Sequence, residues 1–381
     1  MTKPVYKKDP LHSVVNSTLI QLPAPANLTT IWNIGSLLSI CLIIQILTGI
    51  LLASSYSPSI LSSFYIVNFI TENYDKGWLI RYTHANGASL FFICIYTHVG
   101  RGLYYNSYFI KHTWIAGVTI IVLTMAAAFL GYVLPVNQIS FWGASVITNL
   151  FSEVPYIGQD LVKTIWGGPS VDNPTIVRFF TFHFIIPFII LALVVVHITY
   201  LHITGSSNNL GVPSNCGKLI FHPFYSIKDA IGVLIILFIF LALCLHYPLT
   251  LGDDENFVEA DPAVTPHHIQ PEWYFLFAYA ILRSIPNKLG GVIALALSIM
   301  VLYTLPFTAK VSKIKRINIL PASKLLFWLF CWCVILLSWI GIRPVEDPYI
   351  ITGQILTFIY FGYFFLNPLL INYIFNSSNN I

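Results

Sequence analysis

Four histidines stand in two pairs of equal spacing within apolar parts of this 381-residue chain. His84 and His98 are fourteen residues apart, and His183 and His197 repeat that interval. Fourteen residues on an α-helix make just under four turns, so each pair stays close to one face, with its members roughly 21 Å apart along the axis. Two such helices side by side would form two stacked pairs of imidazoles, each able to hold a metal.

The choice of metal follows from the ligands on offer. One histidine on an apolar helix is more often a hydrogen-bonded packing residue, but two pairs of equal spacing favour ligands. Zinc needs about four ligands, and the helices that carry these histidines offer no carboxylate near them. Haem needs two axial ligands and an apolar slot, and with both positions filled its natural role is electron transfer. Arg81 and Arg101 stand three residues from a histidine, where either could pair with a propionate.

The composition places these histidines in a membrane. Hydrophobic residues make up 56% of the chain and charged residues 9%, which excludes an ordinary soluble domain. A net charge of +4 over this length is too weak for a nucleic-acid binding surface. The six cysteines include no Cys-x-x-Cys, so we expect buried thiols and no covalent haem attachment. Nothing near Met1 resembles a cleaved export signal.

Runs without Asp, Glu, Lys or Arg predict eight membrane-spanning helices and an all-α polytopic fold, the first four helices forming a bundle that holds two haems. Residues 273–282 are apolar but too short to cross, so we expect them to dip into the interface and return. Beyond Pro135 we expect short helices on the membrane surface. The predicted spans are 30–53, 78–104, 113–134, 174–203, 229–247, 289–309, 322–342 and 349–373.

Charge fixes the orientation of the spans. Eight crossings put both termini on one side, and that side carries 12 of the 19 basic residues but 2 of the 15 acidic ones. Positively charged loops face the cytoplasm or the mitochondrial matrix. The two histidine-bearing spans then run in parallel, so His84 and His183 share the outer leaflet, and His98 and His197 share the inner one.

Four glycines repeat the interval of fourteen. Gly35 and Gly49 lie in the first span, and Gly117 and Gly131 in the third. Glycine allows a backbone to approach a flat macrocycle, so we expect Gly49 and Gly131 beside the outer haem and the other two beside the inner one. Close packing of membrane helices through small residues explains the glycines equally well on their own, but the histidines favour haem.

With its eight spans, its histidine pairs and the loop Pro271-Glu272-Trp273-Tyr274, the chain resembles cytochrome b, the core subunit of quinol:cytochrome c oxidoreductase, or complex III. The resemblance covers nearly the whole length. Plastid relatives are split into two chains and usually space the second pair by fifteen, so this chain resembles the mitochondrial or bacterial type. Its short length and low charge resemble the mitochondrial type. This implies a di-haem four-helix bundle in 1–210, a four-helix region with the quinol-site loop in 211–381, and a mitochondrial inner membrane location with both termini on the matrix side.

The resemblance also implies two quinone sites. At the outer one, Glu272 and Tyr279 would be catalytic; from the residues alone, Glu272 could accept a proton if burial raises its pKa, or simply open a helix after Pro271. At the inner one, His202 and Asp229 would be catalytic, although a helix-end histidine and an N-cap explain both without function. The outer site would be lined by Met125, Phe129, Gly143, Ile147, Pro271 and Phe275, and the inner site by Asn33, Ser36, Ser206, Phe221 and Lys228, with Ser107 and Trp114 beside the inner haem.

The implied activity is that of a proton-translocating enzyme. Ubiquinol would be oxidised outside, electrons would cross by two non-covalent haem b groups, and quinone would be reduced inside. A Rieske-type iron-sulfur protein, a membrane-anchored c-type cytochrome and other complex III subunits would be separate chains in a homodimeric complex in the lipid bilayer, with no nucleic acid. The alternatives are a simpler two-haem conduit without paired quinone sites and a transporter that uses its intramembrane polar residues for substrate.

The chain departs from the family at two places. Val136-Asn137 stands where Trp-Gly is usual at the mouth of the outer site, and Asp9 stands where a histidine is common near the inner site. Asn137 puts a side chain where glycine leaves room, so we expect an altered outer pocket that still turns over.

Overall fold

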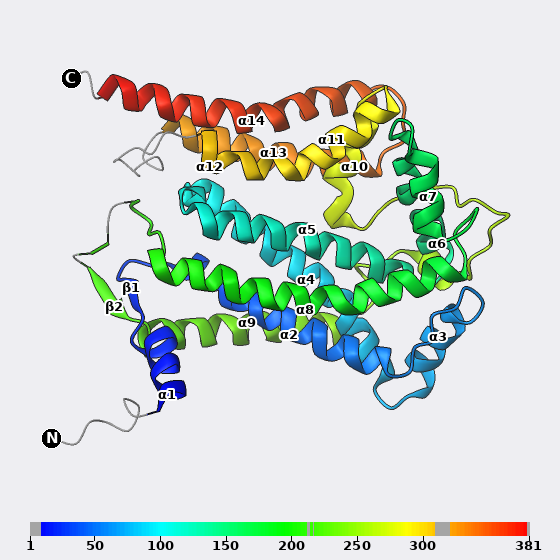
Figure 1. Ribbon diagram of the computed structural model, residues 1–381, viewed down its shortest axis with the longest axis horizontal. Coiled ribbons are helices and arrows are strands. Elements are labelled where there is room, and N and C mark those ends of the chain that lie inside the picture. Colours follow the sequence, from blue (N-terminus) through cyan, green and yellow to red (C-terminus); the bar gives the residue numbers. More distant parts are fainter. Residues whose placement is uncertain (1–8, 212–213, 216, 309–320, 379–381) are drawn as a thin grey trace.

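The computed structural model describes residues 9–211, 214–215, 217–308 and 321–378. Most of these residues are helical, and the long helices lie alongside one another (Figure 1). Cys216 falls outside the described residues. The prediction of orientation also uses basic residues in 1–8 and 309–320, and these fall outside them as well. The long helices are α2 (Ile34–Ala53), α4 (Gly77–Tyr104), α5 (Lys111–Val133), α8 (Asn173–Thr204), α9 (Phe224–His246), α11 (Lys288–Met300), α13 (Pro321–Ile342) and α14 (Tyr349–Ser378).

Shorter elements connect the long helices. Strands β1 (Pro23–Pro25) and β2 (Lys218–Ile220) form an antiparallel pair that joins the N-terminal segment to the segment before α9. The short helices are α1 (Pro10–Val15), η2 (Asn16–Ile20), η3 (Thr30–Asn33), α3 (Ser63–Asn73), η4 (Ser107–Phe109), α6 (Gln138–Asn149), η5 (Leu150–Glu153), α7 (Gly158–Trp166), η6 (Asp254–Phe257), η7 (Trp273–Phe275), α10 (Leu276–Ser284), η8 (Val301–Thr304) and α12 (Leu305–Thr308).

Within the described part of the chain, seven helices are long and apolar enough to cross a membrane: α2 with η3, α5, α8, α9, the continuous run from α11 to α12, α13 and α14. The eighth predicted span is present as α4, whose 28 residues extend about 42 Å. Apolarity alone does not single out α4 because it carries the polar residues Arg81, His84, Asn86, His98 and Arg101.

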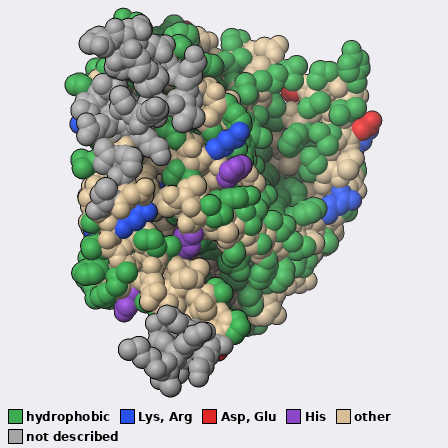
Figure 2. Space-filling view, turned by 60° about the vertical axis from the view of Figure 1, so that its left-hand side comes forward, with side chains coloured by type: hydrophobic (Ala, Val, Ile, Leu, Met, Phe, Trp, Pro, Cys, Tyr) green, Lys and Arg blue, Asp and Glu red, His purple; other side chains and the backbone are tan. Residues whose placement is uncertain are grey.

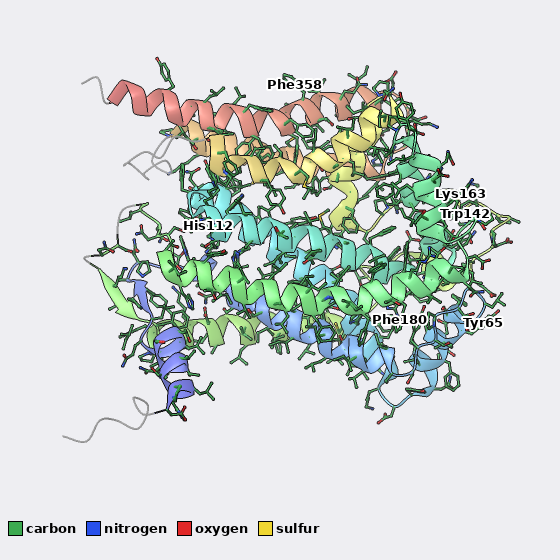
Figure 3. All side chains as sticks on the ribbon, viewed as in Figure 1. Tyr65, His112, Trp142, Lys163, Phe180 and Phe358 are labelled. Carbon is green, nitrogen blue, oxygen red and sulfur yellow. The ribbon has the colours of Figure 1, made fainter. Side chains whose placement is uncertain are left out.

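The sides of the long helices are apolar where they face outward. Phe358 on α14 is 81% exposed and Phe238 on α9 is 75% exposed. Phe358 points away from the other helices in Figure 3, and apolar side chains cover most of the face shown in Figure 2. Such a surface is compatible with lipid and not with water, so the protein is a multi-pass membrane protein.

The first half of the chain packs as two helix pairs. Helix α2 packs against α4, and α5 packs against α8. Helix α9 packs on α2 and α4, and so lies with the first half of the chain although it follows residue 211. The histidines of α4 and α8 meet across the space between the two pairs.

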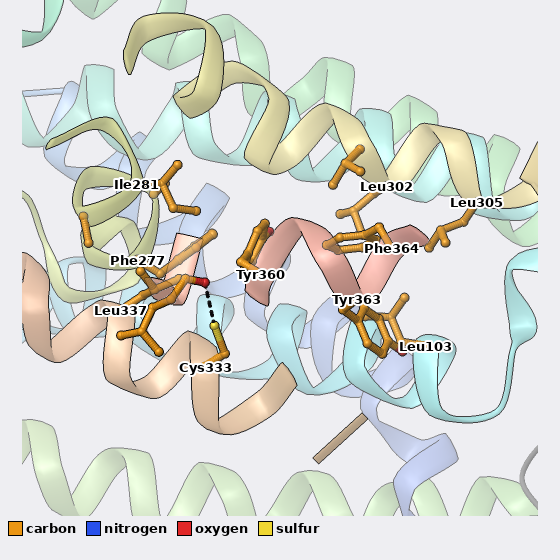
Figure 4. Close-up of a cluster of buried hydrophobic side chains, with 14 of the residues drawn as sticks. Leu103, Phe277, Ile281, Leu302, Leu305, Cys333, Leu337, Tyr360, Tyr363 and Phe364 are labelled. Atoms are coloured by element: carbon orange, nitrogen blue, oxygen red, sulfur yellow. Dashed lines mark hydrogen bonds between the residues drawn. The ribbon is translucent and has the colours of Figure 1, made fainter. Parts of the chain in front are cut away.

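The second half of the chain surrounds α10. This helix is too short to cross, as predicted, and it is buried against α11, α13 and α14. Its depth in the membrane stays a prediction. Phe277 and Ile281 pack there with Leu337 of α13 and Tyr360 of α14 (Figure 4). The stretch after Pro135 forms α6 and α7, which confirms the prediction of short helices. Both lie with α3 at one end of the molecule, opposite β1 and β2 (Figure 1).

Candidate functional site

The outer histidine pair joins α4 to α8. The ring centres of His84 and His183 are 6.2 Å apart, with the rings nearly perpendicular. Nδ1 of His84 lies 2.8 Å from the Thr48 hydroxyl, and Nδ1 of His183 lies 2.8 Å from the Ala127 carbonyl oxygen. A carbonyl only accepts, so His183 carries its proton on Nδ1 and leaves the lone pair of Nε2 free. The Thr48 hydroxyl donates to the Ile44 carbonyl at 2.6 Å, so it can accept from His84 in the same way.

The inner pair has a similar ring separation but different contacts at Nδ1. The ring centres of His98 and His197 are 6.4 Å apart. A guanidinium nitrogen of Arg101 lies 3.4 Å from His98 Nδ1, and the same guanidinium lies over the Trp32 ring. Arg101 Nε is buried without a hydrogen-bond partner among the described residues. A buried guanidinium with an unused donor suits an anionic partner.

Both separations fit one metal between two imidazoles. An imidazole nitrogen binds a metal at about 2.0–2.1 Å, and the ring centre lies roughly 1.1 Å behind it, so two rings on opposite sides of one metal have centres about 6.3 Å apart. The observed 6.2 and 6.4 Å agree with that value at both levels. The described residues hold no cluster of three or more His, Cys, Asp or Glu side chains that would suit zinc. The residues therefore fit two axial ligand pairs.

The four glycines each lie against one of these histidines. A Cβ at Gly49 would be 3.1 Å from Cε1 of His84, and one at Gly117 would be 3.1 Å from Cε1 of His197. A Cβ at Gly35 would be 3.8 Å from His98, whereas one at Gly131 would be only 2.7 Å from Nδ1 of His183. In the structure each glycine leaves room for an imidazole ring, and its contact with a macrocycle stays a prediction.

One cavity of about 300 Å³ contains the outer pair and Glu272. His84, His183, Arg81, Tyr132 and Asn256 are among the residues that line it. Burial raises the pKa of Glu272 to about 7, and the neighbouring Asp253 carboxylate adds to the rise. A carboxyl group with a pKa near neutrality can both take up and release a proton.

Hydrogen bonds to α4 hold the loop that carries Glu272. The Tyr96 hydroxyl donates to the Tyr274 carbonyl, and the Trp273 indole donates to the Ser89 hydroxyl at 3.0 Å. The rings of Tyr274 and Phe92 stack with centres 4.1 Å apart. Because Ser89 is five residues from His84, these contacts fix Glu272 close to the outer pair.

The other residues expected at the outer site are spread more widely. Met125 and Phe275 pack in one buried cluster, and Phe129 packs against Phe179 with ring centres 6.0 Å apart. The Tyr279 hydroxyl donates to the Ile269 carbonyl at 3.3 Å. A Cβ at Gly143 would meet open space. Among the described lining of the Glu272 cavity, none of Met125, Phe129, Gly143, Ile147, Pro271, Phe275 and Tyr279 is found, so their role stays a prediction.

At the opposite end, the starts of α2 and α9 meet. Asn33 Nδ2 donates to the Lys228 carbonyl at 2.8 Å, and Lys228 Nζ donates to the Leu28 carbonyl at 2.8 Å. The Ser36 hydroxyl lies within reach of the Asp229 carboxylate. Within the described part of the chain no hydrogen bond joins this group to the other predicted inner-site residues, His202, Ser206 and Phe221, which stay predictions.

The role of the two residues predicted beside the inner haem, Ser107 and Trp114, stays a prediction. The Ser107 and Ser207 hydroxyls are 2.9 Å apart, and the Trp114 indole donates to the Leu302 carbonyl at 2.8 Å. Trp114 also packs closely on Gly102 of α4, one residue from Arg101. Asp9 caps α1 and lies 3.0 Å from His12, in an exposed position.

Sequence reasoning missed three polar residues of the outer site. Thr48 contacts His84, and the Tyr132 hydroxyl lies within reach of both Glu272 and Asn256. Thr48 precedes Gly49 and Tyr132 follows Gly131, so their position beside the spaced glycines was an available signal. Nothing in the sequence singles out Asn256, because it comes from a loop 16 residues before Glu272.

Fold and site together define a polytopic membrane protein with two facing histidine pairs at different depths. A family model described as Cytochrome b/b6/petB matches residues 19–205, and one described as Cytochrome b(C-terminal)/b6/petD matches residues 259–361. A chain of the solved structure titled "Hyperthermophilic respiratory Complex III" is 30% identical, with a TM-score of 0.90, over 98% of this chain and 99% of that chain. The chain belongs to the cytochrome b/b6 family, has the fold of cytochrome b of complex III, and shares that family's binding of haem b.

Proposed function

We propose that the chain is the di-haem b subunit of a quinol:cytochrome c oxidoreductase that oxidises ubiquinol at the outer side of the mitochondrial inner membrane and reduces quinone at the matrix side. The proposal rests on the distance between the two rings within each histidine pair, since both distances agree with one metal between two imidazoles. Two pairs fourteen residues apart on parallel helices provide carriers at two depths. When bound there, the two haems would each accept and donate one electron.

The ligands would be His84 with His183 on the outer side and His98 with His197 on the inner side. Gly49, Gly131, Gly35 and Gly117 support the proposal because each leaves space for one of these rings. Arg81 lies close to Glu272 in the outer cavity, and Arg101 has an unused donor at the inner pair, so each can bind an anionic propionate.

Quinol oxidation is proposed beside Glu272, whose side chain lines the outer cavity together with His84 and His183. The pKa of Glu272 is near neutrality, so its carboxylate can accept a quinol proton and its acid form can release that proton outward. This carboxyl group favours a quinol-oxidising subunit over a simple two-haem conduit, which needs no proton acceptor. Tyr279 and the apolar residues predicted earlier would position the quinol ring.

Quinone reduction is proposed at the other end, where the starts of α2 and α9 meet. Asp229 and His202 would supply protons, and Asn33, Ser36, Ser206, Phe221 and Lys228 would surround the ring. The bond from Asn33 to the Lys228 backbone supports this grouping because it fixes α9 against α2 beside Asp229.

We propose that the assembly is a homodimer with a Rieske-type iron-sulfur protein, a membrane-anchored c-type cytochrome and further complex III subunits as separate chains. The complex would contribute to a proton gradient because quinol oxidation releases protons on the outer side and quinone reduction takes up protons from the matrix. The excess of basic residues on the side of both termini supports a matrix location for them.

A redox titration of the assembled complex tests the ligand assignment. The unaltered protein should show two b-type redox steps, and His98→Ala should remove one of them. His12→Ala is the matched control, because His12 is an exposed residue of α1 whose ring contacts Asp9. Two intact steps in His98→Ala would overturn the assignment.

A further inference from the structure

The start of α6 is fastened to an acidic segment that follows α9. An isolated antiparallel bridge joins Asn137 to Glu259, and the Gln138 N–H donates to the Val258 carbonyl at 2.9 Å. The Gln138 side chain accepts from the Asp261 N–H at 2.8 Å. These bonds hold the segment 253–261 along α6, at the end of the molecule that also carries α3 and α7 (Figure 1).

Asn137 is the member of this contact that faces the cavity. It is 2% exposed and lies in the cavity lining with Glu272. Its Oδ1 accepts from the Ser140 N–H at 2.9 Å and so caps α6, which leaves only Nδ2 to donate to Oδ1 of Asn256 at 3.2 Å. Both the oxygen and the nitrogen of the buried amide are therefore hydrogen-bonded, and the cap requires the nitrogen to face Asn256.

Asn256 connects this amide to the outer carboxyl group. It lies in η6, in the same cavity as Glu272, and the Tyr132 hydroxyl lies within reach of both side chains. The polar groups from Asn137 to Asn256, Tyr132 and Glu272 are continuous, so a displacement of Asn256 removes the outer support of Tyr132.

We propose that Asn137 is a positioning residue for the outer site: its amide holds Asn256 and η6 against the cavity, and thereby fixes the orientation and water access of Glu272. The inference rests on the proposed role of Glu272 in quinol oxidation. The groups that face Glu272 are Arg81 from α4, Tyr132 from α5, Asp253 from the segment before η6 and Tyr274 from its own loop. If η6 is released, Asp253 moves away from Glu272 and water enters the cavity.

Asn137→Ser tests the proposal, because serine still caps α6 but is too short to reach Asn256. In the assembled complex with a short-chain ubiquinol, kcat for quinol oxidation should fall about fivefold, as expected for one lost hydrogen bond in a positioning network. The pH of half-maximal rate should move to lower pH, because water and the loss of Asp253 both favour the ionised Glu272. Trp142→Phe is the matched control: Trp142 donates to the Asp261 carbonyl from the same helix but does not line the cavity.

A double-mutant cycle distinguishes positioning from general damage. If Asn137 acts through Asn256, the combined Asn137→Ser and Asn256→Ser variant should be no slower than the slower single variant. Additive losses, or an unchanged pH profile in Asn137→Ser, would overturn the proposal. If Asn137→Ser lowers haem content, Asn256→Ser alone carries the pH test, because Asn256 caps no helix. Failure of the proposed function is separate: it would appear as full quinol oxidation in Glu272→Gln.

Discussion

Replacement of Gly131 by alanine should remove the outer haem and leave the inner one. The new Cβ would lie 2.7 Å from Nδ1 and 2.9 Å from Nε2 of His183, and the backbone of α5 cannot yield because it packs along α8. Cε1 would be closer still, so the ring must retreat by more than about 0.7 Å to restore ordinary contacts of roughly 3.4 Å. Metal–ligand distances tolerate changes of only about 0.2 Å, so His183 can no longer bind.

Gly35→Ala is the matched control. It makes the same substitution in a span of the same bundle, but its Cβ would lie 3.8 Å from His98, an ordinary contact. The assay is a reduced-minus-oxidised spectrum with a redox titration of purified complex. We expect one b-type step in Gly131→Ala and two in Gly35→Ala. Two unchanged steps in Gly131→Ala, or equal losses in both variants, would refute the link between these glycines and the imidazoles.

Three further outcomes follow from the same geometry. Glu272→Gln should lower quinol oxidation and abolish the acidic limb of its pH profile, in which the rate falls as pH drops below about 7 because the carboxylate becomes protonated; a limb that persists would assign it to another group. Thr48→Val should weaken retention of the outer haem by about 10- to 100-fold in a haem-loss assay, since His84 loses the acceptor for its Nδ1 proton; equal retention would show that the hydroxyl does not orient the ring. Leu337→Ala should cost about 2–5 kcal/mol in unfolding, because the side chain is fully buried beside α10, and a cost below about 1 kcal/mol would show that this cluster repacks.

Much of the fold could be predicted because membrane spans are long and charge-free. Seven of the predicted spans are helices long and apolar enough to cross a membrane, and α4 is predicted from its long interval between charges despite its lower apolarity. The packing partners of α10 could not be predicted, since ten apolar residues suit a lipid-facing position as well as a protein interior. The contacts of Phe277 and Ile281 with α13 and α14 appear only in the structure.

The candidate site was predictable where it lies on helices and unpredictable where it lies on loops. A spacing of fourteen determines which histidines face each other, because helix geometry converts an interval into a depth. The link from Asn137 to Asn256 spans 119 residues, and no local periodicity contains such a contact. The sequence predicts a side chain in the outer pocket at Asn137, where the family usually has glycine. Only the hydrogen bond from the Ser140 N–H to Asn137 shows which way the amide points.

The two parts of the outer site also differ in when they can form. The proposed axial ligands and their glycines all precede residue 205, whereas Asn256 and Glu272 follow α9. A chain is synthesised from its N-terminus, so the four ligands are in place before the acidic segment and the Glu272 loop are made. The haem pockets can therefore be filled first, and the proton-accepting chamber is closed over them only when Tyr96 and Ser89 receive the arriving loop.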